Sequence, residues 1–565
     1  MYNTEYFLGW SKGMGQIFLG LEETSMANNL EAEVRVPVLI VGGGPVGLAS
    51  AIELSWRGIE CLLVERRNGS INHPKMNQVG VRTVEHCRRW GISQKVKDSS
   101  VPEDFPRSIR FVTATAGYQI AHYDFPARKD EPCVNSPEAI QRCSQIYFDP
   151  ILRDHAKKLG GATFSYSHDF KSFEQDNDGV TAEAVSLEDG KTLRIRADYM
   201  IACDGADSAV RNTLGIGLKG EMSLNFNVNA FFRSSDHDAL FKHGRAVMQW
   251  ITDGQGIWGD IVSINGDDLW RFSLMRLKNG DIPSIEEMGQ HLRRAVGRDF
   301  EFEIFSILPW ERRRVVAEQY QAGRVFLCGD AVHQMSPTGG FGMNTGIQEA
   351  VDIAWKVAAV LQGWGGDNLV GTYDVERRPV AQRIVDEAAR NYNQFGRLPK
   401  GDGADEDTAA GAALRKSIGD KIYAEDFDRE YDMEGVPLGY HYEGSPIIVP
   451  DGTPEPPFEV MTYTPTARPG HRAPHAWLAD GDSTLDLFGH GFTLLCFDED
   501  VDTAPLIEAA TERRVPLKLE TVDNDGIANL YKNRLVLVRP DGHVAWRGDV
   551  LPKDAGALIE TIIGM

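Results

Sequence analysis

Three acidic residues, Glu65, Asp204 and Asp330, each follow a short apolar run that reads as a buried strand. A carboxylate accepts hydrogen bonds from hydroxyl groups, and in α/β domains ligands bind beyond the carboxyl ends of the strands. The three carboxylates therefore predict contacts with a hydroxylated ligand. For Asp204, a turn followed by a helix cap is the alternative.

The strand that precedes Glu65's strand in the sequence is followed by a glycine pattern suited to a pyrophosphate. Residues 36–41, VPVLIV, read as a buried strand, and a helix is expected through about Trp56. The turn between them has the spacing GxGxxG, and Glu65 stands 18 positions beyond its last glycine. Glycines let the backbone approach a pyrophosphate at the helix N-terminus, and the carboxylate takes ribose hydroxyls. The residues expected at this dinucleotide site are Gly42, Gly44, Pro45, Val46, Gly47 and Glu65; a generic strand–turn–helix unit is the alternative.

Residues 323–356 form the stretch around which the rest of the chain is organised. A strand is predicted at 325–328, then a loop with glycines at 339, 340 and 342, then a helix from about Thr345. Apolar residues at 347, 350, 351, 354, 357 and 358 give that helix one buried face. A glycine-rich loop aimed at a helix N-terminus binds anionic groups through free N–H groups and the helix dipole. A tight turn without a ligand is the alternative.

Several further polar residues have two interpretations each. Arg66 and Lys75 could meet the ligand or be solvated surface charges, and Gln145 could contact the ligand or cap the helix that follows it. Arg211 follows Asp204 on a short predicted helix and could bind a phosphate or close a salt bridge.

Composition limits the class of protein. The chain has 565 residues, so two to four domains are expected. The net charge of −23 argues against nucleic acid or an anionic membrane as a partner. No apolar run reaches the ~18 residues of a transmembrane helix. The seven cysteines show no CxxC and no metal-ligand spacing, which predicts reduced thiols, no metal and a cytoplasmic location.

With these motifs placed, the chain resembles the FAD-dependent aromatic hydroxylases of the para-hydroxybenzoate hydroxylase fold. The similarity is to the phenol hydroxylase-like branch, which carries a C-terminal thioredoxin-like domain, and it covers residues 34–565. The C-terminal runs at 470–489 and 538–548 also look like that branch. The motifs that carry the resemblance are Gly42, Gly44, Gly47 and Glu65, then Asp204, Gly205 and Arg211, then Gly329, Asp330, Pro337, Gly342 and Asn344.

The resemblance implies an α/β fold: a Rossmann-like FAD-binding domain, an inserted mixed β-sheet that binds substrate, and a thioredoxin-like domain without CxxC. We expect residues 1–33 to be an N-terminal extension and 396–460 to be a linker with one amphipathic helix. The expected FAD-binding domain comprises 34–104, 136–218 and 311–395, the substrate domain 105–135 and 219–310, and the thioredoxin-like domain 461–565. The last is expected to run β-α-β-β-β-α and to serve as a structural or dimer-forming unit.

The resemblance also implies the cofactors and the residues that hold them. FAD would place its ribose on Glu65 and its pyrophosphate over Gly44–Gly47, while Asp330 would bind the ribityl chain. The implied cofactor-binding residues are Gly42, Gly44, Pro45, Val46, Gly47, Glu65, Arg66, Lys75, Gln145, Asp204, Asp330, Pro337, Gly340, Gly342, Met343 and Asn344. NAD(P)H is the implied co-substrate, and the Asp204-Gly205 segment is assigned in the family to both FAD and NAD(P)H.

The implied reaction is hydroxylation of a phenolic or polycyclic aromatic ring with O2, through a flavin hydroperoxide, by a homodimer. Pro337 beside the flavin and Arg271 on the substrate side are the expected catalytic residues, with a structural salt bridge as the alternative for Arg271. The family's arginine after His-Pro is Lys75 here. Asn77 and Ser273 stand where phenol hydroxylase has an aspartate and a tyrosine, which argues against simple phenol as the substrate.

Three other enzyme classes and one non-catalytic class share part of this pattern. A disulfide reductase needs a reactive cysteine pair, which the sequence lacks. A flavin halogenase needs a WxWxIP run, also absent. A Baeyer–Villiger oxygenase, which inserts oxygen beside a carbonyl, shares these motifs and stays an alternative. A non-catalytic flavin- or ligand-binding protein is the alternative from another class.

Overall fold

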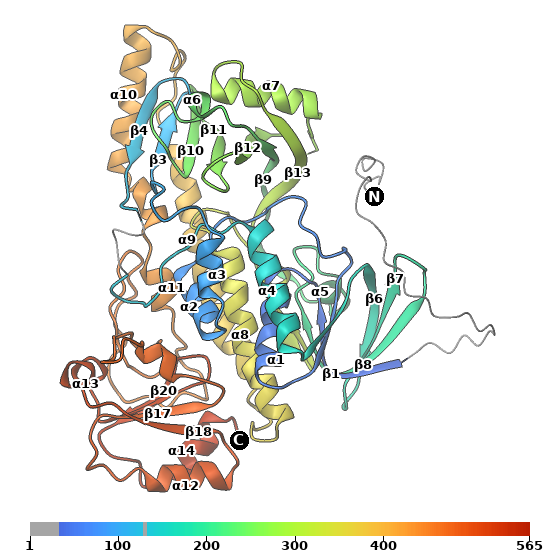
Figure 1. Cartoon of the computed structure of the whole chain (residues 1–565), viewed down its shortest axis with the longest axis vertical. Coiled ribbons are helices and arrows are strands. Elements are labelled where there is room, and N and C mark those ends of the chain that lie inside the picture. The colour runs from blue at the N-terminus through green and yellow to red at the C-terminus, as the bar shows by residue number, and fades with distance from the viewer. Residues whose placement is uncertain (1–32, 128–132, 279) are drawn as a thin grey trace.

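The computed structural model describes residues 33–127, 133–278 and 280–565. The expected N-terminal extension therefore lies outside the described residues, except for residue 33. Three β-sheets organise the described chain, and Figure 1 shows them as an upper unit, a central unit and a lower unit that ends near the C-terminus. Within the described residues, no helix is both long and apolar enough to cross a membrane.

The central unit is a mainly parallel sheet with strand order β14-β15-β8-β1-β2-β5, and β6 and β7 extend it through β8. The four pairs formed by β15, β8, β1, β2 and β5 are all parallel. Residues 38–41 are buried on both faces, which explains their unbroken apolar run. The strands are β1 Glu33–Val41, β2 Cys61–Val64, β5 Ala162–Ser165, β6 His168–Gln175, β7 Val180–Ser186, β8 Thr192–Ala202, β14 Gln321–Ala322 and β15 Val325–Leu327.

Helices cover this sheet, and α1 packs between α8 and α4 (Figure 1). The predicted sheet of parallel strands with flanking helices is confirmed. The long helix α8 begins at Gly342, three residues earlier than the sequence indicated, because Gly342 and Met343 already adopt the helical backbone. The helices are α1 Pro45–Trp56, α2 Val81–Arg89, α3 Ser93–Asp98, α4 Gln145–Leu159, α5 Ala209–Thr213, α8 Gly342–Leu361 and α9 Thr372–Asn393.

The upper unit is the inserted sheet, with strand order β16-β13-β9-β12-β11-β10-β3-β4. It is mixed, since β10 and β3 are parallel whereas its other pairs are antiparallel. Its core packs aromatic side chains of β9, β11 and β12 against α7. The elements are β3 Ile109–Val112, β4 Gln119–Tyr123, β9 Leu218–Arg233, α6 His237–Leu240, β10 Met248–Asp253, β11 Gly256–Ser263, β12 Leu269–Leu277, α7 Ile285–Val296, β13 Glu303–Ala317 and β16 His333–Gln334.

Residues 396–460, which composition suggested to be a linker, pack against the other units. Helix α10, Ala409–Ala424, contacts β4, and its Ile418 and Ile422 are fully buried against aromatic side chains of the upper sheet. The hydroxyl of Tyr431 accepts a hydrogen bond from the indole of Trp250 at 2.6 Å. A short helix, α11, spans Gly435–Gly439 and packs on α2. This segment is therefore part of the folded body, whereas the predicted domain boundaries stay predictions.

The lower unit is a four-stranded mixed sheet with order β18-β17-β19-β20. Its element order is β-α-β-α-β-β-α, so the predicted β-α-β-β-β-α order was wrong in omitting one helix. That helix, α13, is only seven residues long and is capped by the Asn524 side chain, which the apolar pattern did not reveal. The elements are β17 Phe492–Cys496, α12 Ala504–Glu512, β18 Leu517–Thr521, α13 Asp525–Tyr531, β19 Leu535–Val538, β20 Val544–Gly548 and α14 Ala555–Ile562. The likeness to thioredoxin stays a prediction.

Candidate active site

The register of the central sheet brings Glu65, Asp204 and Asp330 to one edge. Strands β2, β1, β8 and β15 are parallel neighbours, and their last residues pair with one another. The segments that leave these strands therefore emerge side by side. This edge is the carboxyl end of the strands, where α/β sheets bind their ligands.

The glycine turn after β1 leaves open space where a phosphate would lie. Gly42 has a φ of +104°, and a Cβ there would lie 2.3 Å from the carbonyl oxygen of Cys203. A Cβ on Gly47 would lie 1.9 Å from the carbonyl oxygen of Gly42, so these two glycines let the turn close on itself. A Cβ on Gly44 would meet nothing within 4 Å. The space over Gly44, at the N-terminus of α1, therefore fits a pyrophosphate.

Glu65 is fixed in place by backbone donors on both sides. Its Oε2 accepts the N–H of Gly43 at 2.6 Å, and its Oε1 accepts the N–H of Arg67 at 2.7 Å. A carboxylate has about four lone-pair sites, so hydroxyl groups of a ligand can still bind. Pro45 and Val46 form the first turn of α1 directly beside it, and Arg66 is exposed.

Asp204 holds an unsatisfied acceptor. Its Oδ2 accepts the N–H of Val210 at 3.1 Å, while its Oδ1 is buried without a hydrogen-bond partner among the described residues. Burial raises the pKa of this carboxyl. A buried oxygen without a partner is costly, and a hydroxylated ligand would satisfy it. Asp330 lies in a 3₁₀ turn, Gly329–Ala331, with its side chain exposed at the same edge.

Arg211 plays a part that neither of its two interpretations anticipated. Its Nη1 donates to the carbonyl oxygens of Ala206 and Ala331, at 3.1 and 2.9 Å. The guanidinium is buried and links the turn after Asp204 to the turn that contains Asp330. The predicted cap is present, because the Ser208 hydroxyl accepts the N–H of Arg211 at 3.0 Å.

The loop at 337–344 is held by the side chain of Asn344. Its Oδ1 accepts the N–H of Gly80 and the hydroxyl of Thr83, both at 2.8 Å, and its Nδ2 donates to the carbonyl oxygens of Gly340 and Gln78. Pro337 is exposed on this loop, Gly340 has a φ of +67°, and Met343 is half-buried. Free N–H groups at the start of α8 therefore border the open edge of the sheet.

Gln145 is not a cap of its own helix. Its side-chain oxygen accepts the N–H of Lys75 at 3.0 Å, and its amide nitrogen donates to Asp149 at 3.0 Å. It thus fixes the segment that carries Lys75, whose own side chain is exposed. Burial raises the pKa of Asp149 to about 7.

Arg271 forms the structural salt bridge that the sequence left open. Its Nη2 lies 3.0 Å from Oδ1 of Asp260 on the neighbouring strand, and both side chains are largely buried. Asn77 and Ser273, which replace the acidic and phenolic groups of phenol hydroxylase, are both buried, and Asn77 donates to the carbonyl oxygen of Ser263. A role for Arg271 toward substrate stays a prediction.

Sequence reasoning missed polar groups that reach the loop from distant segments. The N–H of Gly339 approaches Oε1 of Glu430 at 3.3 Å, and burial raises the pKa of that carboxyl to about 8. Arg142 and Tyr431 line a cavity beside the same loop. No local pattern marks Glu430, because it comes from the segment that composition suggested to be a linker.

Comparison with known proteins identifies the class that this fold and site define. Residues 35–388 match the FAD binding domain family, and residues 466–564 match the family described as aromatic-ring hydroxylase, C-terminal. The chain therefore belongs to the FAD-dependent aromatic-ring hydroxylases. The predicted family, activity class and cofactor are confirmed.

Individual relatives extend over almost the whole chain. FAD-dependent monooxygenase apdD of Emericella nidulans is 33% identical over 91% of this chain and 87% of its own length. Tetracenomycin A2 monooxygenase-dioxygenase of Streptomyces glaucescens is 31% identical over 94% of this chain and 96% of its own length. The solved structure of the rebeccamycin biosynthetic enzyme RebC with reduced flavin has a TM-score of 0.88 at 36% identity, over 94% of this chain and 99% of that one.

These relatives define the reaction. The chain is an FAD-dependent monooxygenase that hydroxylates a phenolic or polycyclic aromatic substrate with O2, and NAD(P)H is the co-substrate typical of the family. The open cradle at Gly44 and the unpartnered Oδ1 of Asp204 fit FAD. A cofactor of this kind supplies the redox chemistry, while the protein supplies binding, orientation and electrostatics.

Proposed function

We propose that this monooxygenase acts on a polycyclic aromatic substrate bound between the loop at 337–344 and the inserted sheet. The observation that carries the proposal is the placement of that sheet over the edge where Glu65, Asp204 and Asp330 emerge (Figure 1). Ligand sites favour such junctions between domains. Solved relatives support the substrate class, since their structures include RebC with bound 7-carboxy-K252c and aklavinone-11 hydroxylase with FAD and aklavinone.

Several of the cofactor-binding residues have a proposed part. Glu65 would accept ribose hydroxyls, the N–H groups behind Gly44 would hold the pyrophosphate, and Asp330 would bind the ribityl chain. When bound, FAD supplies hydride acceptance from NAD(P)H and activation of O2. The N-terminus of α8, at Gly342 and Met343, would stabilise negative charge that develops on the ring system beside it.

The substrate side of the site is built to exclude water and orient a ring. Asn77 and Ser273, which stand where phenol hydroxylase has an aspartate and a tyrosine, are buried and uncharged. Without an acidic or phenolic group at these two positions, we expect a ring that is already electron-rich rather than simple phenol, which would need a base for activation. Pro337 would border the bound ring on the exposed side of the loop.

We also propose that the protein is a cytoplasmic homodimer. The seven cysteines are free, and five of them are buried, which suits a reducing compartment. The dimer is the assembly that the family resemblance implies. Light scattering during size-exclusion chromatography would test the dimer, and a monomer at micromolar concentration would contradict it.

The function is tested by anaerobic stopped-flow reduction of the FAD-loaded protein with NADPH and with NADH, with and without a panel of phenols and hydroxylated polycyclic aromatics. We expect a polycyclic compound to accelerate reduction and to gain one oxygen atom in air. Because hydroxylation and Baeyer–Villiger insertion add the same mass, NMR of the product must locate the oxygen. Fast reduction without any aromatic, or failure of every ring to be oxygenated, would contradict the proposal.

A further inference from the structure

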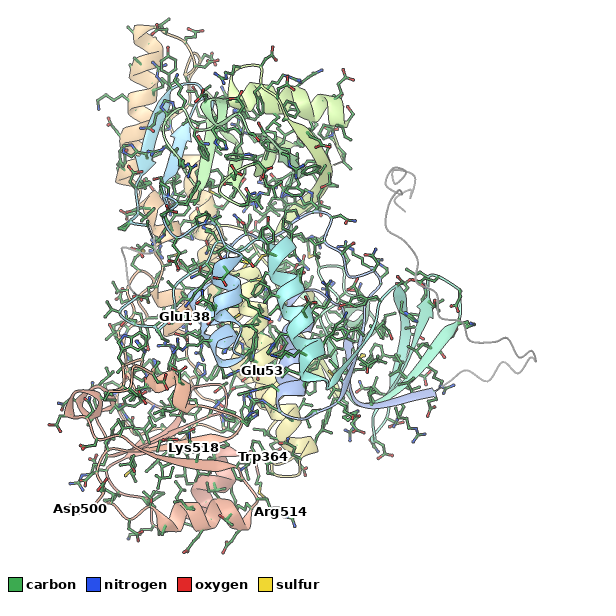
Figure 2. All side chains as sticks on the ribbon, in the orientation of Figure 1. Glu53, Glu138, Trp364, Asp500, Arg514 and Lys518 are labelled. Atoms are coloured by element: carbon green, nitrogen blue, oxygen red, sulfur yellow. The ribbon has the colours of Figure 1, made fainter. Side chains whose placement is uncertain are left out.

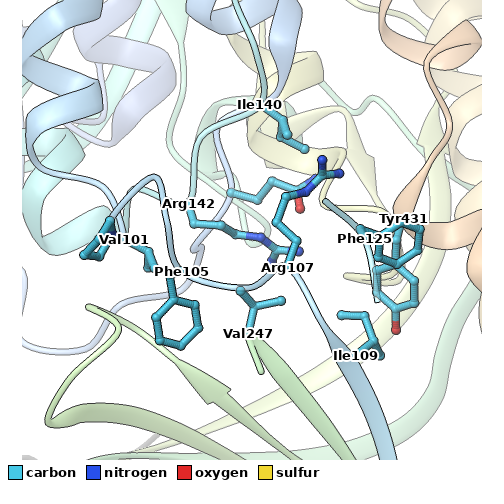
Figure 3. Close-up of a pocket in the computed structure, with 11 residues that line it drawn as sticks. Val101, Phe105, Arg107, Ile109, Phe125, Ile140, Arg142, Val247 and Tyr431 are labelled. Atoms are coloured by element: carbon cyan, nitrogen blue, oxygen red, sulfur yellow. The ribbon is translucent and has the colours of Figure 1, made fainter. Parts of the chain in front are cut away.

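A small cavity lies beside the loop at 337–344, apart from the nucleotide edge. Its volume is about 20 Å³, and apolar walls come from Phe105, Ile109 and Val247. A water molecule needs roughly 10–15 Å³ on this measure, so the cavity admits one small polar group and excludes a whole ring system. Figure 3 shows the side chains of Arg107 and Arg142 extending between these apolar walls.

The cavity adjoins the loop expected beside the flavin. Gln78 lines the cavity, and its Nε2 donates to the carbonyl oxygen of Gly339 at 3.1 Å. Glu430 approaches the N–H of the same Gly339, and the next residue, Tyr431, lines the cavity. A substituent placed in the cavity would therefore belong to a ring held against this loop.

Arg142 is the group that gives the cavity its chemistry. Its guanidinium makes no hydrogen bond or ion pair with any of the residues that the structure describes, although it is half-buried. Other arginines on neighbouring strands are paired, Arg271 with Asp260 at 3.0 Å and Arg110 with Asp124 at 3.3 Å. A guanidinium removed from bulk water normally donates hydrogen bonds to an acceptor. For Arg142, an acceptor of this kind can lie in the cavity.

The electrostatic surroundings favour an anion at this place. Burial and the charge of Arg107 lower the pKa of Arg142 to about 10, so an added negative charge would relieve both effects. The facing carboxyl of Glu430 does not supply that charge at neutral pH, because burial raises its pKa to about 8. The charge of Arg142 is thus left for a ligand to balance.

We propose that the cavity is a subsite for a carboxylate substituent of the aromatic substrate, bound by Arg142. This inference rests on the proposed function and names the substrate class: a hydroxylated aromatic acid. Guanidinium and carboxylate form parallel, charge-assisted hydrogen bonds, which fix orientation as well as affinity. Binding the carboxylate here would set which ring carbon faces the loop at 337–344.

The test compares acids with their methyl esters on the FAD-loaded full-length protein. Hydroxynaphthoic and hydroxybenzoic acids and the corresponding esters are titrated, and dissociation constants are read from the change in flavin absorbance. We expect at least one acid to bind more tightly than its ester. In R142M that preference should fall by about ten- to hundredfold, the worth of one charge-assisted contact. R142K should keep part of it, because lysine retains the charge without the bidentate geometry.

Arg245 offers a matched control. It is exposed, and its guanidinium stacks 5.6 Å from the ring centroid of Phe105, a wall of the cavity, without lining the cavity itself. R245M should keep the native preference for the acid, and ester binding in all three variants should stay within about twofold of the native protein.

Two outcomes would overturn the subsite: no acid binding more tightly than its ester, or a preference that survives R142M. Failure of the subsite differs from failure of the proposed function. If a ring is hydroxylated with no preference for the acid, the subsite is wrong and the function stands. If the preference depends on Arg142 while no ring is oxygenated, the subsite stands and the function is wrong.

Discussion

Gly44 and Gly47 lie three residues apart in the same turn, yet their surroundings differ. A Cβ on Gly47 would strike the carbonyl oxygen of Gly42 at 1.9 Å, whereas a Cβ on Gly44 would meet open space. One glycine is therefore required by the fold itself and the other only by what binds there. The sequence motif alone does not make this distinction, because both glycines fit GxGxxG equally.

This difference predicts opposite effects of two alanine substitutions. G44A should leave the apoprotein's unfolding free energy nearly unchanged and weaken FAD binding by about ten- to hundredfold, because the methyl group occupies the phosphate cradle. G47A should destabilise the apoprotein by at least about 2 kcal/mol, because the backbone must shift. Urea unfolding of the apoprotein and FAD titration distinguish the two. A G44A protein that binds FAD like the native one would contradict the assignment of the cradle.

Glu430 should give the protein a pH-dependent stability. Burial raises its pKa to about 8 from an ordinary value of 4.5, so the unfolded chain loses this proton first as pH rises. The folded state is therefore destabilised progressively between about pH 4.5 and pH 8. E430Q should remove this slope, which is at most about 1.4 kcal/mol per pH unit. Urea unfolding at pH 5.5, 7 and 8.5 measures it, with exposed Glu443→Gln as the control; equal profiles for E430Q and the native protein would refute the assignment.

At the scale of elements, the strand-and-helix pattern was predictable because buried parallel strands are continuous apolar runs. Residues 36–41 were predicted as a strand for this reason, and β1 contains all of them while beginning earlier, at Glu33. The start of α8 was not predicted correctly. Asn344 fixes the loop there through contacts with residues 78–83, which are remote in sequence. The same limit applies to Arg142 and Glu430, whose positions depend on tertiary packing rather than on local periodicity.

The four hydrogen bonds of the Asn344 side chain predict that this residue orders the loop at 337–344. N344A removes four hydrogen bonds, two of them to N–H or hydroxyl donors and two to carbonyl oxygens. We expect a loss of about 2–3 kcal/mol in unfolding free energy and faster amide exchange at residues 337–343. N393A, at an exposed position on α9, should change stability by less than about 0.5 kcal/mol. Unchanged exchange in N344A would mean that other contacts order the loop.

At the scale of the molecule, the lower unit shares a core with the FAD-binding unit. Trp355 and Trp364, on and just beyond α8, each pack 6.2 Å from the ring of Phe492 on β17. Figure 2 places Trp364 at the border between the two units. The Arg539 guanidinium, from the turn after β19, pairs with Glu376 at 2.6 Å and with Asp352 at 3.2 Å. The contact between the lower unit and the FAD-binding unit is thus both apolar and ionic, and the side chains that form it are buried.

Removing Arg539 should be costly because it leaves acidic side chains unpaired in the interior. Burial alone would raise the pKa of Glu376, but Arg539 and Lys356 outweigh it and lower that pKa to about 2. R539M should therefore lower the unfolding free energy by about 3–5 kcal/mol, with a smaller loss at acidic pH, where Glu376 is protonated in the variant. R513M, which breaks a partly exposed pair with Glu560, should cost much less than R539M, because solvent screens that pair. Similar losses in the two variants would show that burial of the network does not matter.

Helix α8 connects this docking to the flavin site, because its first residues border the loop at 337–344 and its far end lies in the core shared with β17. A chain that ends at about residue 460 would expose Trp355 and Trp364 to water and leave Glu85 and Glu376 without Arg472 and Arg539. We expect such a chain to lose FAD affinity and soluble folded protein together, since both ends of one helix are affected. Circular dichroism, FAD titration and light scattering of the truncated chain measure this. A truncated protein that stays folded, dimeric and active would show that α8 holds the loop at 337–344 without the lower unit. The lower unit would then have a role outside the FAD-binding unit and the inserted sheet.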